Sequence, residues 1–178
     1  MVEEARLSQE GSGLAPTGEG WFVVNILDTA WIANEHFGAC CFFESGTVSF
    51  PQTGFTLSVL QPGQPNGLYH RESNQEDFLV LAGTCLLLVE GEERRLSAGD
   101  FFHCPPDCEH ILVGDGHAPC VVFMTGSRTG EKEIVYPRSE LALRRGAGVP
   151  TETARPADAY ASLPKWESAP APSELPWR

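Results

Sequence analysis

Turn signals recur at short intervals through the middle of this chain, and this rhythm constrains its fold more than any other feature. The signals are rich in glycine, proline and aspartate: Pro62-Gly63, Gly83-Thr84, Glu90-Gly91-Glu92, Ala98-Gly99-Asp100, Pro105-Pro106-Asp107 and Gly114-Asp115-Gly116. Short β-branched, aromatic and leucine-rich runs lie between them. Short strands joined by such turns predict an all-β sandwich or barrel.

The 178 residues have the length of a single domain with a well-buried core. We expect a flexible N-terminal tail over residues 1–20, because this segment is rich in glycine and acidic residues. A β-barrel domain is expected over residues 21–137. A C-terminal arm over residues 138–178 should hold short helices and a proline-rich end.

Within these segments, strands are expected over residues 21–27, 38–43 and 54–60, and short helices over 139–145 and 157–163. In the third strand, Phe55, Leu57 and Val59 alternate with Thr56, Ser58 and Leu60. Trp166 and Trp177 lie in the C-terminal arm. A tryptophan buries a large apolar area, so we expect this arm to dock on its own barrel or on a dimer partner.

The net charge and the cysteines indicate which binding partners and which cellular compartment to expect. The chain has 24 acidic and 12 basic side chains, and its net charge of −12 repels nucleic acids and anionic membranes. No secretory signal or membrane-spanning run is visible, so a cytoplasmic location is expected. Reduced thiols are then expected at all six cysteines: Cys40, Cys41, Cys85, Cys104, Cys108 and Cys120.

Two spaced groups of metal-ligand residue types lie among the predicted strands. His70, Glu72 and Glu76 are separated by even intervals, so on an extended strand they would project from one face. Further along, His110 follows the turn at Pro105. Charged groups on an inward face are costly unless they are paired or bound to a metal. These residues therefore predict a functional site.

The first group resembles the first signature motif of the cupin superfamily, in which His-x-His is followed by Glu and then by Gly. His70, Glu76 and Gly83 match this spacing. Glu72 stands where the second histidine is usual, and the opening glycine, Gly67, is shifted towards His70.

The second group resembles the second cupin motif. Gly99, Pro105 and His110 have its spacing, whereas Asp107 and Gly114 replace a glycine and an asparagine. The resemblance covers about residues 54–125.

This resemblance implies a cupin-type antiparallel β-barrel, or jelly roll, and a homodimer. It implies one divalent metal ion (Fe, Mn, Ni or Zn) held by His70, Glu72, Glu76 and His110. The implied function is metal-dependent chemistry on a small molecule in the barrel, with an oxygenase of the dioxygenase type as the leading expectation. The alternatives are a non-catalytic binding module and a Lewis-acid isomerase or lyase. No catalytic residue is assigned, and no nucleotide or cofactor fingerprint is present.

Glu72 leaves two predictions open. As a ligand, it would complete a two-histidine, two-carboxylate site that favours harder ions such as Mn²⁺ or Fe. If it does not bind, His70, Glu76 and His110 form the set that is typical of non-haem Fe(II) oxygenases, and Glu72 is a nearby acid or base. Coordination is favoured, because this slot supplies a ligand in the family. A barrel that has lost its metal is the third alternative.

Overall fold

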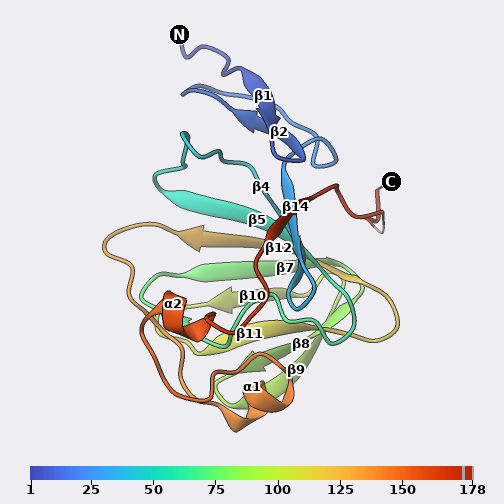
Figure 1. Cartoon of the computed structure of the whole chain (residues 1–178), viewed down its shortest axis with the longest axis vertical. Helices are drawn as coiled ribbons and strands as arrows, with labels where there is room; N and C mark the ends of the chain where they lie inside the picture. Colours follow the sequence, from blue (N-terminus) through green and yellow to red (C-terminus); the bar gives the residue numbers. More distant parts are fainter. Residues whose placement is uncertain (174, 178) are drawn as a thin grey trace.

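The structure is a computed structural model that describes residues 1–173 and 175–177, and it is built mainly of antiparallel strands (Figure 1). Strands together with isolated β-bridges account for 43% of the residues and helices for 5%. The barrel strands are β3 (Trp31–Asn34), β4 (Gly38–Phe42), β5 (Thr53–Leu60), β6 (Arg71–Glu72), β7 (Glu76–Ala82), β8 (Thr84–Val89), β9 (Glu92–Ser97), β10 (Phe101–Cys104), β11 (His110–Asp115), β12 (Cys120–Ser127) and β13 (Ile134–Val135).

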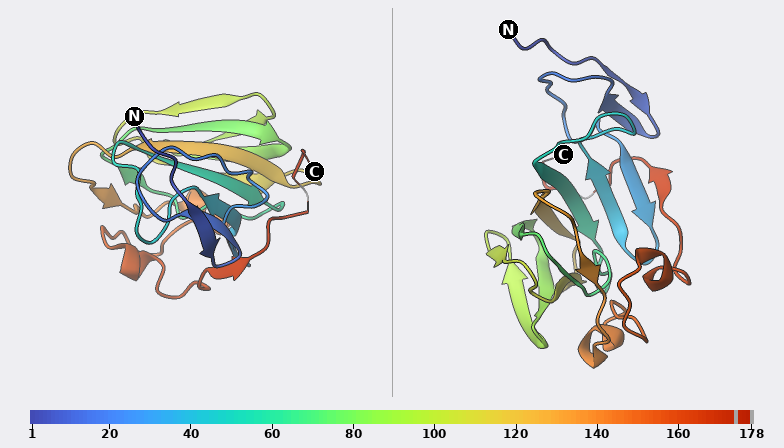
Figure 2. Two further views of the ribbon diagram at one scale, coloured as in Figure 1. Left: turned by 90° about the horizontal axis from the view of Figure 1, so that it is seen from above. Right: turned by 90° about the vertical axis from the view of Figure 1, so that its left-hand side faces the viewer.

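The strands form two main sheets that face each other (Figures 1 and 2). The larger sheet has seven strands in the order β10-β7-β12-β5-β4-β3-β14, where β14 is Glu167–Ala169. The smaller has the order β11-β8-β9, and a short β13-β6 pair lies beside them. This confirms the expected antiparallel jelly-roll barrel.

Both faces of the larger sheet pack against a hydrophobic cluster, and β5 contributes side chains to each of the two clusters. Leu60 belongs to the core cluster that includes Val80 and Leu112, whereas Leu57 and Val59 belong to a second cluster around Trp31. Successive side chains of a strand point to opposite faces, so the alternation expected for residues 54–60 is confirmed.

The N-terminal segment differs from the sequence expectation. Where a flexible tail is predicted, β1 (Leu7–Glu10) and β2 (Gly13–Pro16) form a hairpin that projects beyond the barrel (Figure 2). The strand expected over residues 21–27 is wrong, because the Asn25 side chain accepts a hydrogen bond from Leu27 N and stabilises a turn there. The first strand of the larger sheet along the chain is instead β3.

The C-terminal arm docks on its own barrel. Its β14 pairs with β3, Leu175 is buried, and the Trp166 ring stacks on Phe37 at a centroid distance of 6.0 Å. Glu174 and Arg178, which belong to the predicted arm, lie outside the described residues.

Two short helices precede β14. The first, α1 (Glu140–Arg144), is capped by the Ser139 side chain, which accepts a hydrogen bond from Ala142 N. The second, α2 (Pro156–Ala159), is shorter than the helix expected over residues 157–163. None of the helices in the described part of the chain has the length and apolar character that a membrane span requires.

Gly83 is expected to tolerate no side chain. Its φ of +73° is one that L residues adopt at a cost, and an added Cβ would lie 2.3 Å from the carbonyl oxygen of Pro119. Gly91 has a similar φ of +79° but open space around it. We expect Gly91→Ala to lower the free energy of unfolding by about 1–2 kcal/mol, and Gly83→Ala by about 2–5 kcal/mol. Thermal and denaturant unfolding measure both, and equal losses would contradict the steric argument.

Candidate metal centre

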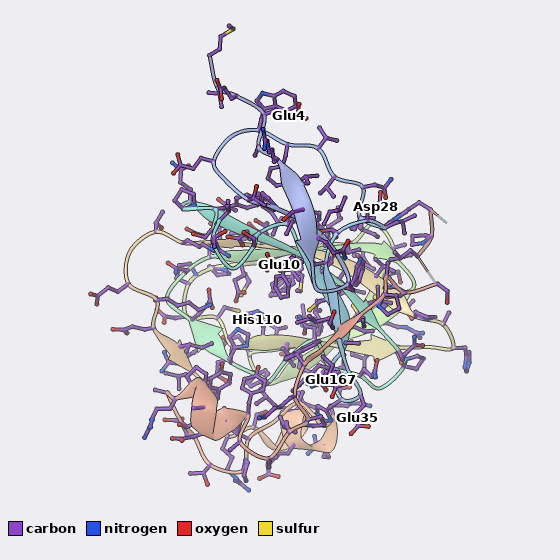
Figure 3. The ribbon with its side chains drawn as sticks, turned by 45° about the horizontal axis from the view of Figure 1, so that its top comes forward. Glu4, Glu10, Asp28, Glu35, His110 and Glu167 are labelled. Carbon is purple, nitrogen blue, oxygen red and sulfur yellow. The ribbon has the colours of Figure 1, made fainter. Side chains whose placement is uncertain are left out.

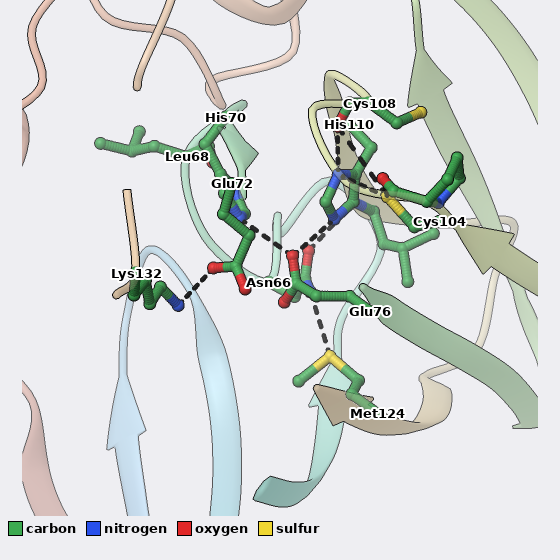
Figure 4. A network of polar contacts seen from close by, with 12 residues as sticks. Asn66, Leu68, His70, Glu72, Glu76, Cys104, Cys108, His110, Met124 and Lys132 are labelled. Atoms are coloured by element: carbon green, nitrogen blue, oxygen red, sulfur yellow. Dashed lines mark hydrogen bonds and ion pairs between the residues drawn. The ribbon is translucent and has the colours of Figure 1, made fainter. Parts of the chain in front are cut away.

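Three potential ligand side chains converge from three separate elements (Figure 4). His70 precedes β6, Glu76 begins β7 and His110 begins β11. Glu76 Oε2 lies 3.4 Å from Nε2 of each histidine, and the candidate ligand atoms all lie within 4.8 Å of one another. The expectation that His70, Glu72 and Glu76 share one strand face is wrong, because the chain bends between β6 and β7.

Backbone hydrogen bonds hold the two histidines together. His110 N donates to His70 O at 2.8 Å, and His70 N donates to His110 O at 3.2 Å. His110 is only 1% exposed and lies in the interior of the barrel (Figure 3). The turn after β10 therefore places His110 beside His70, the residue that precedes β6.

The tautomers of both histidines leave Nε2 available. His70 Nδ1 lies 2.8 Å from Leu68 O, and His110 Nδ1 lies 3.1 Å from Cys108 O. Carbonyl oxygens only accept hydrogen bonds, so each Nδ1 is the donor and Nε2 of each neutral imidazole would be the nitrogen that a metal ion binds. Burial, with a smaller effect of His70, lowers the pKa of His110 to about 4, so its imidazole is neutral at neutral pH.

The polar atoms at the centre of the group fit a divalent cation. Glu72 Oε2, Glu76 Oε2 and His110 Nε2 are buried and have no hydrogen-bond partner among the described residues. Burial would raise the pKa of Glu76, but contacts with His70 and His110 outweigh it and lower this pKa overall. An ionised carboxylate and two imidazole nitrogens that meet at one buried point are a donor set that suits a divalent metal ion.

Glu72 has a different partner. Its carboxylate, with a side chain only 4% exposed, is in ion-pair contact with Lys132 Nζ (Figure 4). Burial and the charge of Glu76 raise the pKa of Glu72, although Lys132 opposes this. The structure thus groups three of the four residues expected as ligands, and coordination by Glu72 stays a prediction.

A cavity of about 520 Å³ opens beside these residues. Besides the metal-centre group, its walls include Asn66, Asn74, Phe78, Arg128, Lys132 and Tyr160. Cavities of this size accommodate small molecules.

Sequence reasoning missed Lys132 and Tyr160. Lys132 lies between β12 and β13, and Tyr160 follows α2, so each reaches the cavity only through the folding of distant segments. The hydroxyl of Tyr160 accepts a hydrogen bond from Leu68 N at 3.2 Å, which ties the C-terminal arm to the segment before His70. Neither residue stands in a recognisable motif.

All six cysteines are free thiols in the structure. Cys104 Sγ lies 3.2 Å from His110 Nδ1, on the side of the ring that faces away from Glu76. Burial raises the pKa of Cys104 above its usual range, so this thiol remains protonated.

Comparisons with known proteins agree with this architecture. Residues 56–126 match the family model for the cupin domain. A search of curated protein sequences finds no match.

Solved structures with the same fold include a sugar phosphate isomerase of a cupin superfamily from Silicibacter pomeroyi. It is 18% identical over 85% of this chain and 98% of that chain, with a TM-score of 0.54. The polyketide cyclase RemF from Streptomyces resistomycificus is 14% identical over 61% of this chain and 80% of that chain, with a TM-score of 0.53.

A third structure, provisionally named a sugar phosphate isomerase, comes from Acidithiobacillus ferrooxidans. It is 27% identical over 48% of this chain, and the match spans 56% of that protein, with a TM-score of 0.46. The cupin-domain match over residues 56–126 lies within the jelly-roll barrel, so this part of the chain is similar in sequence and in fold to the cupin domain.

Proposed function

We propose that this protein is a metal-dependent cupin that acts on a small molecule in its cavity as an oxygenase of the dioxygenase type. The observation that carries the proposal is the convergence of His70 Nε2, Glu76 Oε2 and His110 Nε2 within 4.8 Å, at the wall of the cavity. Two histidines and one carboxylate are the ligand set of non-haem Fe(II) oxygenases.

Each residue around this centre has a definable task. A bound metal ion would supply a Lewis acid with open positions for dioxygen and for a substrate oxygen. The carbonyls of Leu68 and Cys108 orient the histidines through Nδ1. Glu72 lines the cavity and has a raised pKa, so its carboxylate is suited to hold or move a proton while Lys132 positions it.

Metal content and oxygen uptake test the proposal on the full chain purified without a histidine tag. We expect about one divalent metal ion per chain, and oxygen consumption by the Fe(II)-loaded protein with at least one substrate from a panel of small molecules. Protein that binds no divalent metal after reconstitution would contradict the metal centre. Stoichiometric metal without oxygen consumption would contradict the oxygenase.

A Lewis-acid isomerase or lyase is the second candidate, and Glu72 favours it. A buried carboxylate with a raised pKa beside the metal centre suits proton transfer that needs no dioxygen. Anaerobic exchange of substrate hydrogen with deuterated solvent separates this candidate from the oxygenase. A protein that binds metal and ligand but shows neither reaction would be a binding module.

A further inference from the structure

The charges around the cavity differ from those of the whole chain. The chain has twice as many acidic as basic side chains. The cavity walls instead hold two of each, Glu72 and Glu76 against Arg128 and Lys132. Arg128 is itself paired with Glu44 outside the cavity, which leaves Lys132 against two carboxylates, so a divalent ion on the metal centre would give the cavity a small excess of positive charge. Such a field favours an anionic ligand.

The two basic residues are not equivalent. The guanidinium of Arg128 is held by both carboxylate oxygens of Glu44, at 2.6 and 2.7 Å, and it also donates to Phe50 O at 2.9 Å. Arg128 therefore serves to fix the segment after β12. Lys132 has Glu72 as its one recorded partner among the described residues. An ammonium group has three donors, so Lys132 retains hydrogen-bonding capacity for a ligand.

Asn74 provides a second donor group beside Lys132. It lines the cavity and is 7% exposed, yet its side-chain amide has no hydrogen-bond partner among the described residues. The amide is not among the fully buried polar atoms that lack a partner, so it faces the cavity and is open to a ligand there.

The backbone brings Asn74 and Lys132 together. Ser73 N donates to Glu133 O at 2.9 Å, and Glu133 N donates to Ser73 Oγ at 2.9 Å. These two residues are the immediate neighbours of Asn74 and Lys132, and β6 pairs with β13 directly beside them. Lys132 and Asn74, which both line the cavity, thus come from backbone segments that lie side by side.

We propose that Lys132 and Asn74 form a subsite for the oxyanion of a small substrate, a carboxylate or a phosphate ester, next to the metal centre. The inference rests on the proposed function and adds the chemical class of its substrate. Lys132 neutralises the anion and donates to it, and the Asn74 amide supplies a further hydrogen bond. Glu72 competes with the anion for Lys132, so anion binding also frees the Glu72 carboxylate.

Lys132 and Lys165 are the two lysines of the sequence, and this makes the test sharp. Reductive ¹³C-methylation keeps their charge and gives one NMR signal for each lysine. We expect succinate or glycerol phosphate to shift the Lys132 signal and to leave the Lys165 signal in place. Uncharged succinamide and glycerol should shift neither. The comparison of succinate with glycerol phosphate tells which oxyanion the subsite prefers.

Variants measured by calorimetry complete the test, on Zn²⁺-loaded protein and on the same protein stripped with a chelator. Lys132→Ala should weaken binding of the preferred anion roughly tenfold to a hundredfold, and Asn74→Ala should weaken it less. Lys132→Arg should retain most of the affinity, because it keeps the charge. Glu72→Gln should tighten binding, because it removes the competing carboxylate. Lys165→Ala is the matched control and should have no effect.

Equal anion affinity in the wild type and in Lys132→Ala would overturn the subsite, as would an absence of any anion binding. Metal content measured on the same samples reports on the metal centre separately. Metal binding without a Lys132-dependent anion would therefore reject the subsite and leave the metal centre standing. Lys132-dependent anion binding in protein that takes up no metal would reject the metal centre and leave the subsite standing.

Discussion

Glu76→Ala is expected to abolish stoichiometric metal binding. Glu76 is the one carboxylate in the group of three, and its Oε2 lies 3.4 Å from Nε2 of both His70 and His110. Without it, two neutral imidazoles would have to hold a divalent ion alone. Loss of a residue that merely supports a ligand costs about 10–100-fold in metal affinity, so loss of this ligand should cost more. Elemental analysis of tag-free protein measures the metal content.

Asp77→Ala is the matched control for this prediction. Asp77 is the next residue on β7, but its carboxylate pairs with His103 Nδ1 at 2.7 Å and does not line the cavity. This variant should retain the metal and the fold. Folding of both variants is checked by circular dichroism. Stoichiometric metal in well-folded Glu76→Ala would show that the centre lies elsewhere.

Glu72→Gln is expected to keep the metal and lose turnover. The amide has the size of the carboxylate but cannot exchange a proton, and a positioned acid or base contributes about 10²–10⁴-fold to the rate. The side chain is buried and contacts Lys132, so the substitution exchanges an ion pair for a neutral contact. Metal content and the rate with the substrate identified by the uptake assay are measured on the same preparation.

Coordination of the metal by Glu72 would give a different result. If Glu72 coordinates the metal, Glu72→Gln should weaken metal binding, and Glu72→His should restore it through a third imidazole. A metal-bound structure decides directly. A Glu72 oxygen at roughly 2.0–2.3 Å from the ion shows coordination, and one beyond about 3 Å leaves a three-residue set.

Local chemistry explains why much of the fold could be predicted from the sequence. Turn residues and strand alternation act over a few neighbours, and the sheet faces of Leu57, Val59 and Leu60 follow directly from that alternation. The helix expected over residues 139–145 forms as α1, since its cap at Ser139 is a local hydrogen bond. The hairpin of β1 and β2 was missed because its composition resembles that of a flexible tail.

The sequence by itself determined the all-β fold and predicted four metal ligands, because spacing and residue type carry that information. The structure brings three of them, His70, Glu76 and His110, together in a candidate metal centre. Only the tertiary structure decided the partner of Glu72. The even spacing of Glu72 and Glu76 predicted a shared strand face, but the chain turns between β6 and β7. Lys132 then reaches Glu72 through the pairing of β13 with β6, a contact between segments far apart in the chain. Long-range contacts of this kind depend on how whole sheets pack, so local patterns do not reveal them.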